Sequence, residues 1–424
     1  MVSANNDWTP FVVSAPGKVI LFGEHAVVYG KAAIAGSVDM RAYALVTPRN
    51  DNRARMAFPD IDIDVLFDGD TLPRLGSNDL VHPSEVEALV PEGINVSEGP
   101  GRIAILTFVY LYGSILAGRN EGAAGFNICV RSLLPVGAGL GSSAAFNVAL
   151  SAALLQLSGQ LQTDGSGAVD RKLINQWAFQ GEQVAHGTPS GIDNSVATYG
   201  GFLKYVKGEA SVSLNSRHAL RVLITNTNVP KSTKALVAGV RSLRDRHPAV
   251  IDGILDTIHS IATSAAALFQ SDSGDATDMA ALELQVQDII QINHGLLSTL
   301  GVSHASLERV RAITAARGLA SKLTGAGGGG CALTLIPHGM PDDSVDAVER
   351  ELAVEGFQCY RTVVGGGGVA ITREVRGCSI EMWLRSLLDQ QQQNTSQSCS
   401  DVFDIEIAGF AAFSAGSIAE LKPE

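Results

Sequence analysis

The sequence predicts an α+β fold built in two parts that meet near residue 215. Residues 11–47 alternate β-branched runs with glycine turns, which is typical of consecutive strands. Helical patterns dominate the rest of the first part, and an apolar strand at 221–228 opens a second series of long helices followed by apolar strands. Strands and helices grouped in separate runs, without strict alternation, indicate α+β organisation.

In the first part, residues 51–100 are rich in Asp, Pro and Gly, and predict irregular connections with short strands. Three segments then place apolar residues at helical spacing. These predicted helices cover residues 103–117, 144–157 and 171–186. The uncharged stretch 103–118 contains Thr107 and Tyr110 and is shorter than the roughly 20 apolar residues of a membrane span, so it predicts a buried core helix.

In the second part, four long helical stretches follow the strand at 221–228 and end near Arg317. Apolar strands are predicted at 333–336, 359–364 and 369–372, with a helix between the first two. Beyond Glu374 the sequence becomes low in complexity and predicts a loosely held extension. The expected domains are therefore residues 10–215, residues 216–375 and a low-complexity C-terminal extension over residues 376–424.

The composition is that of a globular, mildly acidic protein. With 46% hydrophobic and 17% charged residues the chain can bury large cores, which argues against a disordered or fibrous protein. The 31 basic and 43 acidic residues give a formal net charge of −12, so we expect no nucleic-acid partner. The five cysteines are scattered without a C-x-x-C pair, which fits a reducing compartment. Because no basic-then-apolar leader precedes the first strand, we expect an intracellular protein without a membrane span.

The most informative segment is residues 134–145, where three glycines at alternate positions (Gly137, Gly139, Gly141) precede two serines. Such glycines let the backbone approach a ligand, and amides at a helix N-terminus favour phosphate oxygens because the macrodipole stands behind them. A serine hydroxyl there can also reach a magnesium ion. The alternative is a glycine turn with a serine N-cap.

Two common nucleotide signatures do not account for the glycines. The usual phosphate loop needs Gly, four residues and Gly-Lys-Ser/Thr, which the chain lacks. Residues 322–331 contain Gly-x-Gly-x-x-Gly, but a dinucleotide fingerprint opens a helix after a strand, whereas here a strand is predicted at 331–336 after the loop. We expect this segment to pack closely or to form a second wall of a phosphate site. Gly365–Gly368 is expected to be a hairpin or packing turn.

A lysine lies inside the first strand-rich segment. Strand alternation sends Lys18 to the same face as Ile20 and Phe22, and a lysine in so apolar a strand needs a carboxylate partner. The alternative is an exposed lysine at a strand end. Glu24 and His25 follow within eight residues of Lys18.

Two carboxylates stand in or before the turn-dense stretch 186–194. Asp193 lies within it, and Glu182 lies near the end of the preceding predicted helix. One could act as a base and the other as a metal ligand. Taken singly, Asp193 is more often an Asx-turn residue.

Three of these segments together resemble the superfamily of galactokinase, homoserine kinase, mevalonate kinase and phosphomevalonate kinase, the GHMP kinases. Residues 16–25 are similar to its first motif, 135–145 to its second motif and 322–331 to its third motif. Within the superfamily, residues 23–30, 187–194 and 229–234 look like the mevalonate kinase family. The resemblance covers about residues 11–371, and the tail has no counterpart.

The resemblance implies a fold and an activity. The fold would be the two-domain GHMP-kinase architecture, with an N-terminal ribosomal-protein-S5-domain-2-like domain and a C-terminal ferredoxin-like domain. The activity would be phosphorylation of the primary hydroxyl of (R)-mevalonate to 5-phosphomevalonate, with ATP and Mg²⁺, in isoprenoid and sterol biosynthesis. Two rival functions are another small-molecule kinase of the superfamily and a non-catalytic, ligand-sensing relative.

The resemblance also implies roles for single residues. By motif match, Asp193 would take the hydroxyl proton and Lys18 would pair with it. Magnesium would be held by Ser143 and Glu182. Mevalonate would be lined by Glu24, His25 and Thr233. ATP would be bound by Ser132, Gly137, Ala138, Gly139, Leu140, Gly141, Ser142 and Ser143.

Other family properties follow as expectations. Asp60 stands where mevalonate kinases often have Asn beside the adenine, so it is left out of the expected site. A homodimer is implied, and feedback inhibition by prenyl diphosphates is common in the family, most simply by competition at the ATP phosphate site. A segment resembling a peroxisomal address overlaps residues 18–26. Because the active site needs those residues, we expect a cytoplasmic protein.

Overall fold

The computed structural model describes residues 8–75, 83–94, 99–116, 125–135, 137–161, 169–214, 216, 218–271 and 276–372. The predicted extension over residues 376–424 lies outside them. The predicted domain boundary at residue 215 lies in one of the gaps, between strands β7 and β8. The division into these domains therefore stays a prediction.

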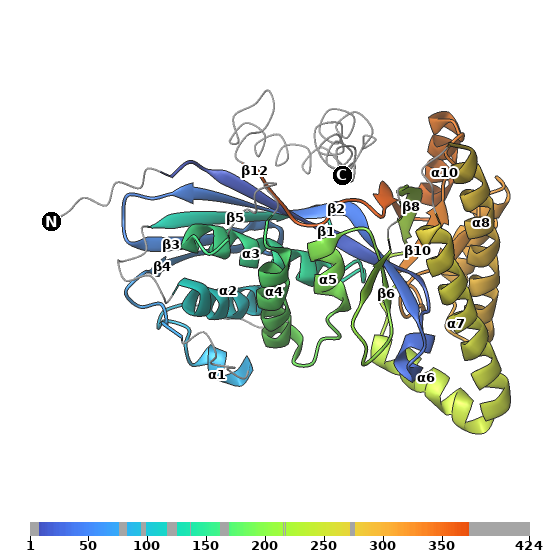
Figure 1. The fold of residues 1–424 in the computed structure, drawn as a ribbon, viewed down its shortest axis with the longest axis horizontal. Coiled ribbons are helices and arrows are strands. Elements are labelled where there is room, and N and C mark those ends of the chain that lie inside the picture. Colours follow the sequence, from blue (N-terminus) through green and yellow to red (C-terminus); the bar gives the residue numbers. More distant parts are fainter. Residues whose placement is uncertain are drawn as a thin grey trace, which may run out of the picture.

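One continuous sheet runs through the molecule, with the order β4-β3-β5-β2-β11-β8-β10-β9 (Figure 1). β1 lies beside β2 and β12, while β6 and β7 form a hairpin against β2. The strands are β1 (Phe11–Phe22), β2 (Ala33–Pro48), β3 (Arg53–Phe58), β4 (Ile63–Asp68), β5 (Phe126–Ser132), β6 (Phe202–Tyr205), β7 (Val212–Leu214), β8 (Leu220–Asn226), β9 (Ser321–Leu323), β10 (Cys331–Leu335), β11 (Gln358–Val364) and β12 (Ala370–Thr372). β2 and β11 are joined through one residue pair, Val38 and Val364, which links the two halves of the sheet.

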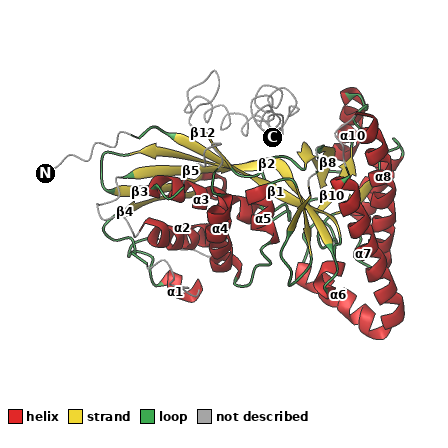
Figure 2. Cartoon of the chain, in the orientation of Figure 1, coloured by secondary structure: helices red, strands yellow, loops and turns green. Residues whose placement is uncertain are grey.

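Helices α2 to α5 cover one face of the first half of this sheet (Figure 2). Helix α3 is apolar nearly all round and packs against α2, α4, α5 and the sheet, because a helix without a polar face must be buried on every side. In β5, every second residue from Phe126 to Ser132 is buried, as expected of a strand with one face on the core. The helices of this half are α1 (Pro83–Glu87), α2 (Pro100–Leu116), α3 (Ser142–Ser158), α4 (Arg171–His186) and α5 (Ile192–Tyr199), with short 3₁₀ turns η1 (Ala26–Tyr29) and η2 (Pro59–Ile61).

The second half confirms the expected ferredoxin-like arrangement. Its strands occur along the chain as β8, β9, β10 and β11, with helices after β8 and after β10, and lie in the sheet in the order β11-β8-β10-β9, all antiparallel. Helices α7 and α8 stand side by side at this end of the molecule (Figure 1). The helices of this half are α6 (Thr233–Arg246), α7 (Pro248–Gln270), α8 (Ala276–Thr299), α9 (Ala305–Ala315) and α10 (Asp342–Val354).

Most predicted elements are confirmed, with one clear error. The helix predicted over 103–117 is α2, whose residues Ala104–Leu116 are buried, and among the described helices none is long and apolar enough to cross a bilayer. No helix was predicted in the turn-dense stretch 186–194, but its turns end at Gly191 and helix α5 begins at Ile192. Asp193 therefore lies in the first turn of a helix.

Gly365–Gly368 is confirmed as a packing turn. The Gly201 amide donates to the Gly366 carbonyl at 2.8 Å, and a Cβ on Gly368 would collide with the Thr198 carbonyl oxygen. Only glycine allows this close approach of two backbones. The turn thereby anchors the segment between β11 and β12 to the end of α5.

Candidate active site

The second motif forms a tight glycine loop that leads directly into helix α3. Gly141 occupies the N-cap position with φ of 77°, in the left-handed region that favours glycine, and no side chain in the described part of the chain caps the helix. A Cβ on Gly141 would lie 2.8 Å from Lys18 Cγ, so the glycine also makes room for that lysine. The backbone amides of the first helical turn are therefore not bonded to a capping side chain and are available to an anion. The alternative interpretation, a turn with a serine N-cap, would have occupied one of them.

Lys18 and Asp193 form an ion pair beside this loop. Lys18 Nζ lies 3.0 Å from Asp193 Oδ1, and the two side chains are 12% and 36% exposed. The Lys18 amide donates to the Leu140 carbonyl at 2.8 Å, which ties β1 to the second motif. The structure thus supplies the carboxylate partner that the position of Lys18 in an apolar strand requires, and leaves the aspartate open on one side.

Glu182 and Ser143 form a hydrogen-bonded pair close enough to Asp193 for its charge to act on Glu182. Ser143 Oγ donates to Glu182 Oε1 at 2.7 Å, and Asn147 Nδ2 donates to the same oxygen at 2.5 Å. His186 Nε2 stands 3.1 Å from Ser143 Oγ. Burial raises the pKa of Glu182, hydrogen bonds from Ser143 and Asn147 oppose that rise, and the negative charge of Asp193 adds to it. A cation near Glu182 would therefore relieve an unfavourable buried charge.

This donor set fits magnesium. A hydroxyl and a carboxylate are hard oxygen ligands, and Mg²⁺ usually takes one or two such protein ligands together with phosphate oxygens and water. Across the described part of the chain, no group of three or more His, Cys, Asp or Glu side chains could hold a metal by itself. A magnesium ion at Ser143 and Glu182 would therefore depend on phosphate oxygens for its remaining ligands.

Lys231 is a site residue that the sequence-based expectation missed. A Cβ on Gly139 of the second motif would lie 3.4 Å from Lys231 Nζ, and a Cβ on Gly330 of the third motif would collide with it. Burial lowers the pKa of Lys231, and the neighbouring Lys18 lowers it further. No carboxylate among the described residues offsets this charge. Lys231 lies within the segment 229–234 that resembles the family, which was the available signal.

The residues expected on the mevalonate side differ in their burial. His25 is buried in a left-handed backbone conformation, with φ of 61°, and its Nε2 donates to the Ala326 carbonyl at 2.9 Å. Burial lowers the pKa of His25. Thr233 is exposed and opens helix α6, two residues after Lys231.

Glu24, also expected on the mevalonate side, lies in the protein interior. Its side chain is fully buried, where it pairs with Lys322 and accepts a hydrogen bond from Asn293 Nδ2 at 3.0 Å. Burial raises the pKa of Glu24, and the Lys322 ammonium opposes the rise. No part of this side chain reaches the surface, and the expected contact of its carboxylate with the substrate stays a prediction.

Ser132 ends β5 immediately before the second motif. Its amide donates to Asp60 Oδ2 at 2.8 Å, and Asp60 also pairs with Arg131 at 3.2 Å. Burial raises the pKa of Asp60, and these two contacts oppose the rise. Asp60, omitted from the expected site, is thus the residue that holds the end of β5 through η2.

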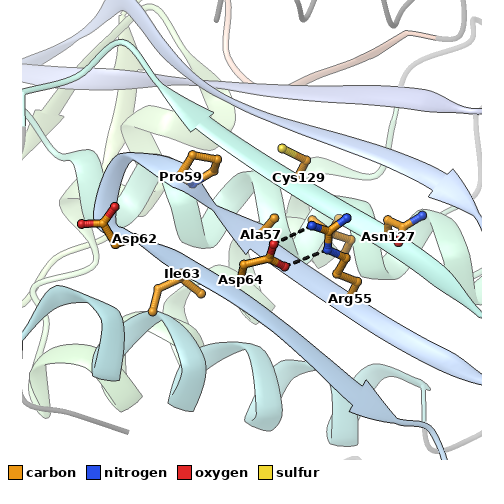
Figure 3. A pocket seen from close by; sticks show the side chains of 9 residues that line it. Arg55, Ala57, Pro59, Asp62, Ile63, Asp64, Asn127 and Cys129 are labelled. Carbon is orange, nitrogen blue, oxygen red and sulfur yellow. Dashed lines mark hydrogen bonds and ion pairs between the residues drawn. The ribbon is translucent and has the colours of Figure 1, made fainter. Parts of the chain in front are cut away.

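A cavity of about 480 Å³ lies on the face of β3, β4 and β5 that turns away from the helices (Figure 3). The Arg55–Asp64 ion pair crosses its floor, with a hydrogen bond of 2.7 Å from Arg55 Nε. None of the expected site residues lines this cavity. It therefore does not form part of the candidate active site.

Comparison with known proteins agrees with this geometry. Family models described as "GHMP kinases N terminal domain" and "GHMP kinases C terminal" match residues 109–201 and 279–356. Mevalonate kinase of Homo sapiens is 41% identical over 373 residues, covering 83% of this chain and 92% of that protein. The chain belongs to the mevalonate kinase family. A second member, mevalonate kinase of Arabidopsis thaliana, is 40% identical over 82% of this chain and 95% of its own length.

Solved structures show the same fold. Mevalonate kinase of Methanococcus jannaschii aligns with a TM-score of 0.64 at 22% identity, covering 84% of this chain and 98% of that one. The L. major mevalonate kinase, solved in complex with R-mevalonate, aligns with a TM-score of 0.59 at 24% identity, covering 84% and 96%. The α+β, two-part architecture is therefore that of the mevalonate kinase family.

Proposed function

We propose that this chain transfers the γ-phosphoryl group of ATP to the primary hydroxyl of (R)-mevalonate and forms 5-phosphomevalonate, a step of isoprenoid and sterol biosynthesis. The observation that carries the proposal is the Lys18–Asp193 ion pair, with a 3.0 Å separation, beside the glycine loop at the start of α3. A carboxylate steadied by a cation next to an anion site is the arrangement that phosphoryl transfer to an alcohol requires.

In the proposed reaction, Asp193 accepts the proton of the substrate hydroxyl. Carboxylates are weak bases for alcohols, but in a loose transition state the nucleophile keeps its proton until late, so a well-placed weak base suffices. Lys18 orients this carboxylate and, since it also borders Gly141, lies close to the developing negative charge. Positioning and charge neutralisation then supply most of the acceleration.

The triphosphate is proposed to lie in the second motif. The backbone amides from Gly137 to Ser142 and the positive end of the α3 dipole favour its oxygens. Lys231 adds an unneutralised charge between the second and third motifs. Ser143 and Glu182 would hold Mg²⁺, which when bound neutralises charge on the β- and γ-phosphates.

The decisive experiment is ADP production by purified protein with Mg²⁺-ATP and each of four alcohols: mevalonate, galactose, homoserine and phosphomevalonate. We expect turnover with mevalonate and less than about a hundredth of it with the others. Preference for another alcohol would favour a different kinase of the superfamily. Binding of ATP without phosphate transfer in a single-turnover experiment would favour the ligand-sensing alternative.

Replacement of Ser143 by alanine tests the magnesium assignment. Removing the hydroxyl is expected to raise the Mg²⁺ concentration required for half-maximal rate by about tenfold, because one oxygen ligand is lost. The matched control is Ser151→Ala on the same helix, whose buried hydroxyl has no hydrogen-bond partner among the described residues. Equal magnesium dependence in Ser143→Ala and the control would contradict the assignment.

Replacement of Lys231 by methionine tests its proposed contact with phosphate. The methionine keeps the apolar stem but not the charge, so kcat/KM for ATP is expected to fall by about a hundredfold. Lys234→Met removes an exposed charge three residues further along and serves as the control. A similar, small change in both variants would show that Lys231 acts only through general electrostatics.

Three further properties are proposed from family membership. The protein would form a homodimer, would act in the cytoplasm, and would be inhibited by prenyl diphosphates. Inhibition by competition at the phosphate site predicts that rising ATP concentration restores the rate, which steady-state kinetics at several inhibitor concentrations would measure.

A further inference from the structure

Helix α8 carries two adjacent buried polar residues that serve different motifs. Asn293 and His294 are 0% and 1% exposed. Asn293 Nδ2 donates to Glu24 Oε2 at 3.0 Å, in the first motif. His294 Nδ1 accepts a hydrogen bond of 3.2 Å from the Leu323 amide, in the third motif. Neither contact belongs to the helix itself. These partners offset the cost of burying Asn293 Nδ2 and His294 Nδ1.

The second ring nitrogen of His294 is held by one carboxylate, that of Glu308. His294 Nε2 donates to Glu308 Oε1 at 2.9 Å, and that oxygen also accepts from Ser303 at 2.6 Å and Ser298 at 3.0 Å. Although burial acts to raise the pKa of Glu308, the hydrogen bonds from Ser303 and His294 lower it to about 2. A charged Glu308 keeps the proton on Nε2, so Nδ1 remains an acceptor for the Leu323 amide.

The two motifs are also bonded to each other where α8 touches them. Lys322, next to Leu323, pairs with Glu24. Further along the third motif, the Ala326 carbonyl accepts from His25. Together with the two α8 contacts, these bonds form a closed ring from Asn293 through Glu24, Lys322 and Leu323 back to His294.

The first motif needs such support because of its backbone. His25 has φ of 61°, and a non-glycine residue in this region carries backbone strain that persists only where the surroundings hold it. His25 makes its ring contact with the third motif, whose position depends in turn on Leu323. Loss of the α8 contacts would therefore weaken the support that holds His25 in this backbone conformation.

We propose that Asn293 and His294 are positioning residues, a brace on α8 that sets the Glu24–His25 turn against the third motif and so shapes the alcohol-binding side of the active site. Only the kinetic part of the test, the KM for mevalonate, rests on the proposed function. The proposal also gives buried Glu24 a defined role. Its carboxylate would connect Asn293 of the brace to Lys322 of the third motif, and would not contact the substrate.

The test compares His294→Leu with His294→Gln. Glutamine can accept from the Leu323 amide and donate to Glu308, whereas leucine can do neither. We expect His294→Leu to raise the KM for mevalonate by about tenfold while kcat and the KM for ATP change by less than about threefold. Hydrogen exchange in the peptide over residues 23–30 should also accelerate, although His294 does not bond to that segment. His294→Gln should stay near wild type in both.

Two further variants keep the test decisive. Asn293→Ala removes the other half of the brace and is expected to act in the same direction, which matters if His294→Leu does not fold. Glu283→Leu is the matched control, since Glu283 is buried on the same helix and accepts from the His338 amide at 3.0 Å, outside all three motifs. It should lower thermal stability without changing the KM for mevalonate or the exchange of residues 23–30.

The outcomes separate the brace from the proposed function. If the His294 and Asn293 variants lose stability like the control while KM and the exchange of residues 23–30 stay at wild-type values, the brace is wrong. If wild-type protein does not phosphorylate mevalonate but exchange still responds to His294→Leu and not to His294→Gln, the brace stands and the proposed function fails.

Discussion

Replacement of Asp193 by alanine is expected to lower kcat by at least about a thousandfold, with ATP affinity changed by less than about threefold. The side chain lies in the first turn of α5, 3.0 Å from Lys18, and contacts neither the glycines of the second motif nor Lys231 in any described hydrogen bond or ion pair. Its loss therefore removes the proton acceptor and leaves the phosphate side of the site in place.

Steady-state kinetics of ADP release and equilibrium binding of a non-hydrolysable ATP analogue measure the two quantities separately. Asp193→Asn is the informative companion, because it keeps the shape and one acceptor oxygen but cannot take a proton. Both variants should lose turnover to a similar degree. Turnover of Asp193→Ala within about tenfold of wild type would refute the role of this aspartate.

The second large effect is expected for Lys18→Met. Methionine fills the space of the lysine stem beside Gly141 but leaves Asp193 without its cation, and the backbone bond from residue 18 to Leu140 is retained. We expect kcat to fall by about two to three orders of magnitude with nucleotide binding nearly intact, because the lost charge acts chiefly on the transition state.

Lys18→Arg serves as the control for charge alone. Arginine keeps the positive charge but is larger and planar, so it should restore part of the loss and not all of it. Full activity in Lys18→Met would show that the ion pair holds the structure together without a part in the reaction.

Local patterns were enough to predict much of this molecule. Helix α3 is apolar on all sides, and the strands around it are β-branched, so their types follow from composition and period alone. The glycine spacing of the second motif likewise predicted an anion site. Both signals lie within short stretches of chain, where neighbouring residues determine the outcome.

Three features could not be predicted because distant partners determine them. Helix α5 is eight residues long and follows a turn that contains Gly and Pro. Two helical turns are too few to show a clear apolar periodicity next to such turn residues. Strand β9 has three residues and exists through its pairing with β10. The burial of Glu24 depends on Lys322, a residue 298 positions later in the chain.

Strand β12 returns from the end of the described chain to pair with the first strand, placing Thr372 opposite Val12. A polypeptide emerging from the ribosome must therefore wait for nearly all of the described residues before the edge of β1 at residues 12–14 is covered. Contacts between residues so far apart in the chain slow folding. Until then that edge offers unpaired amides and carbonyls to other chains, which makes nascent intermediates the species most exposed to aggregation.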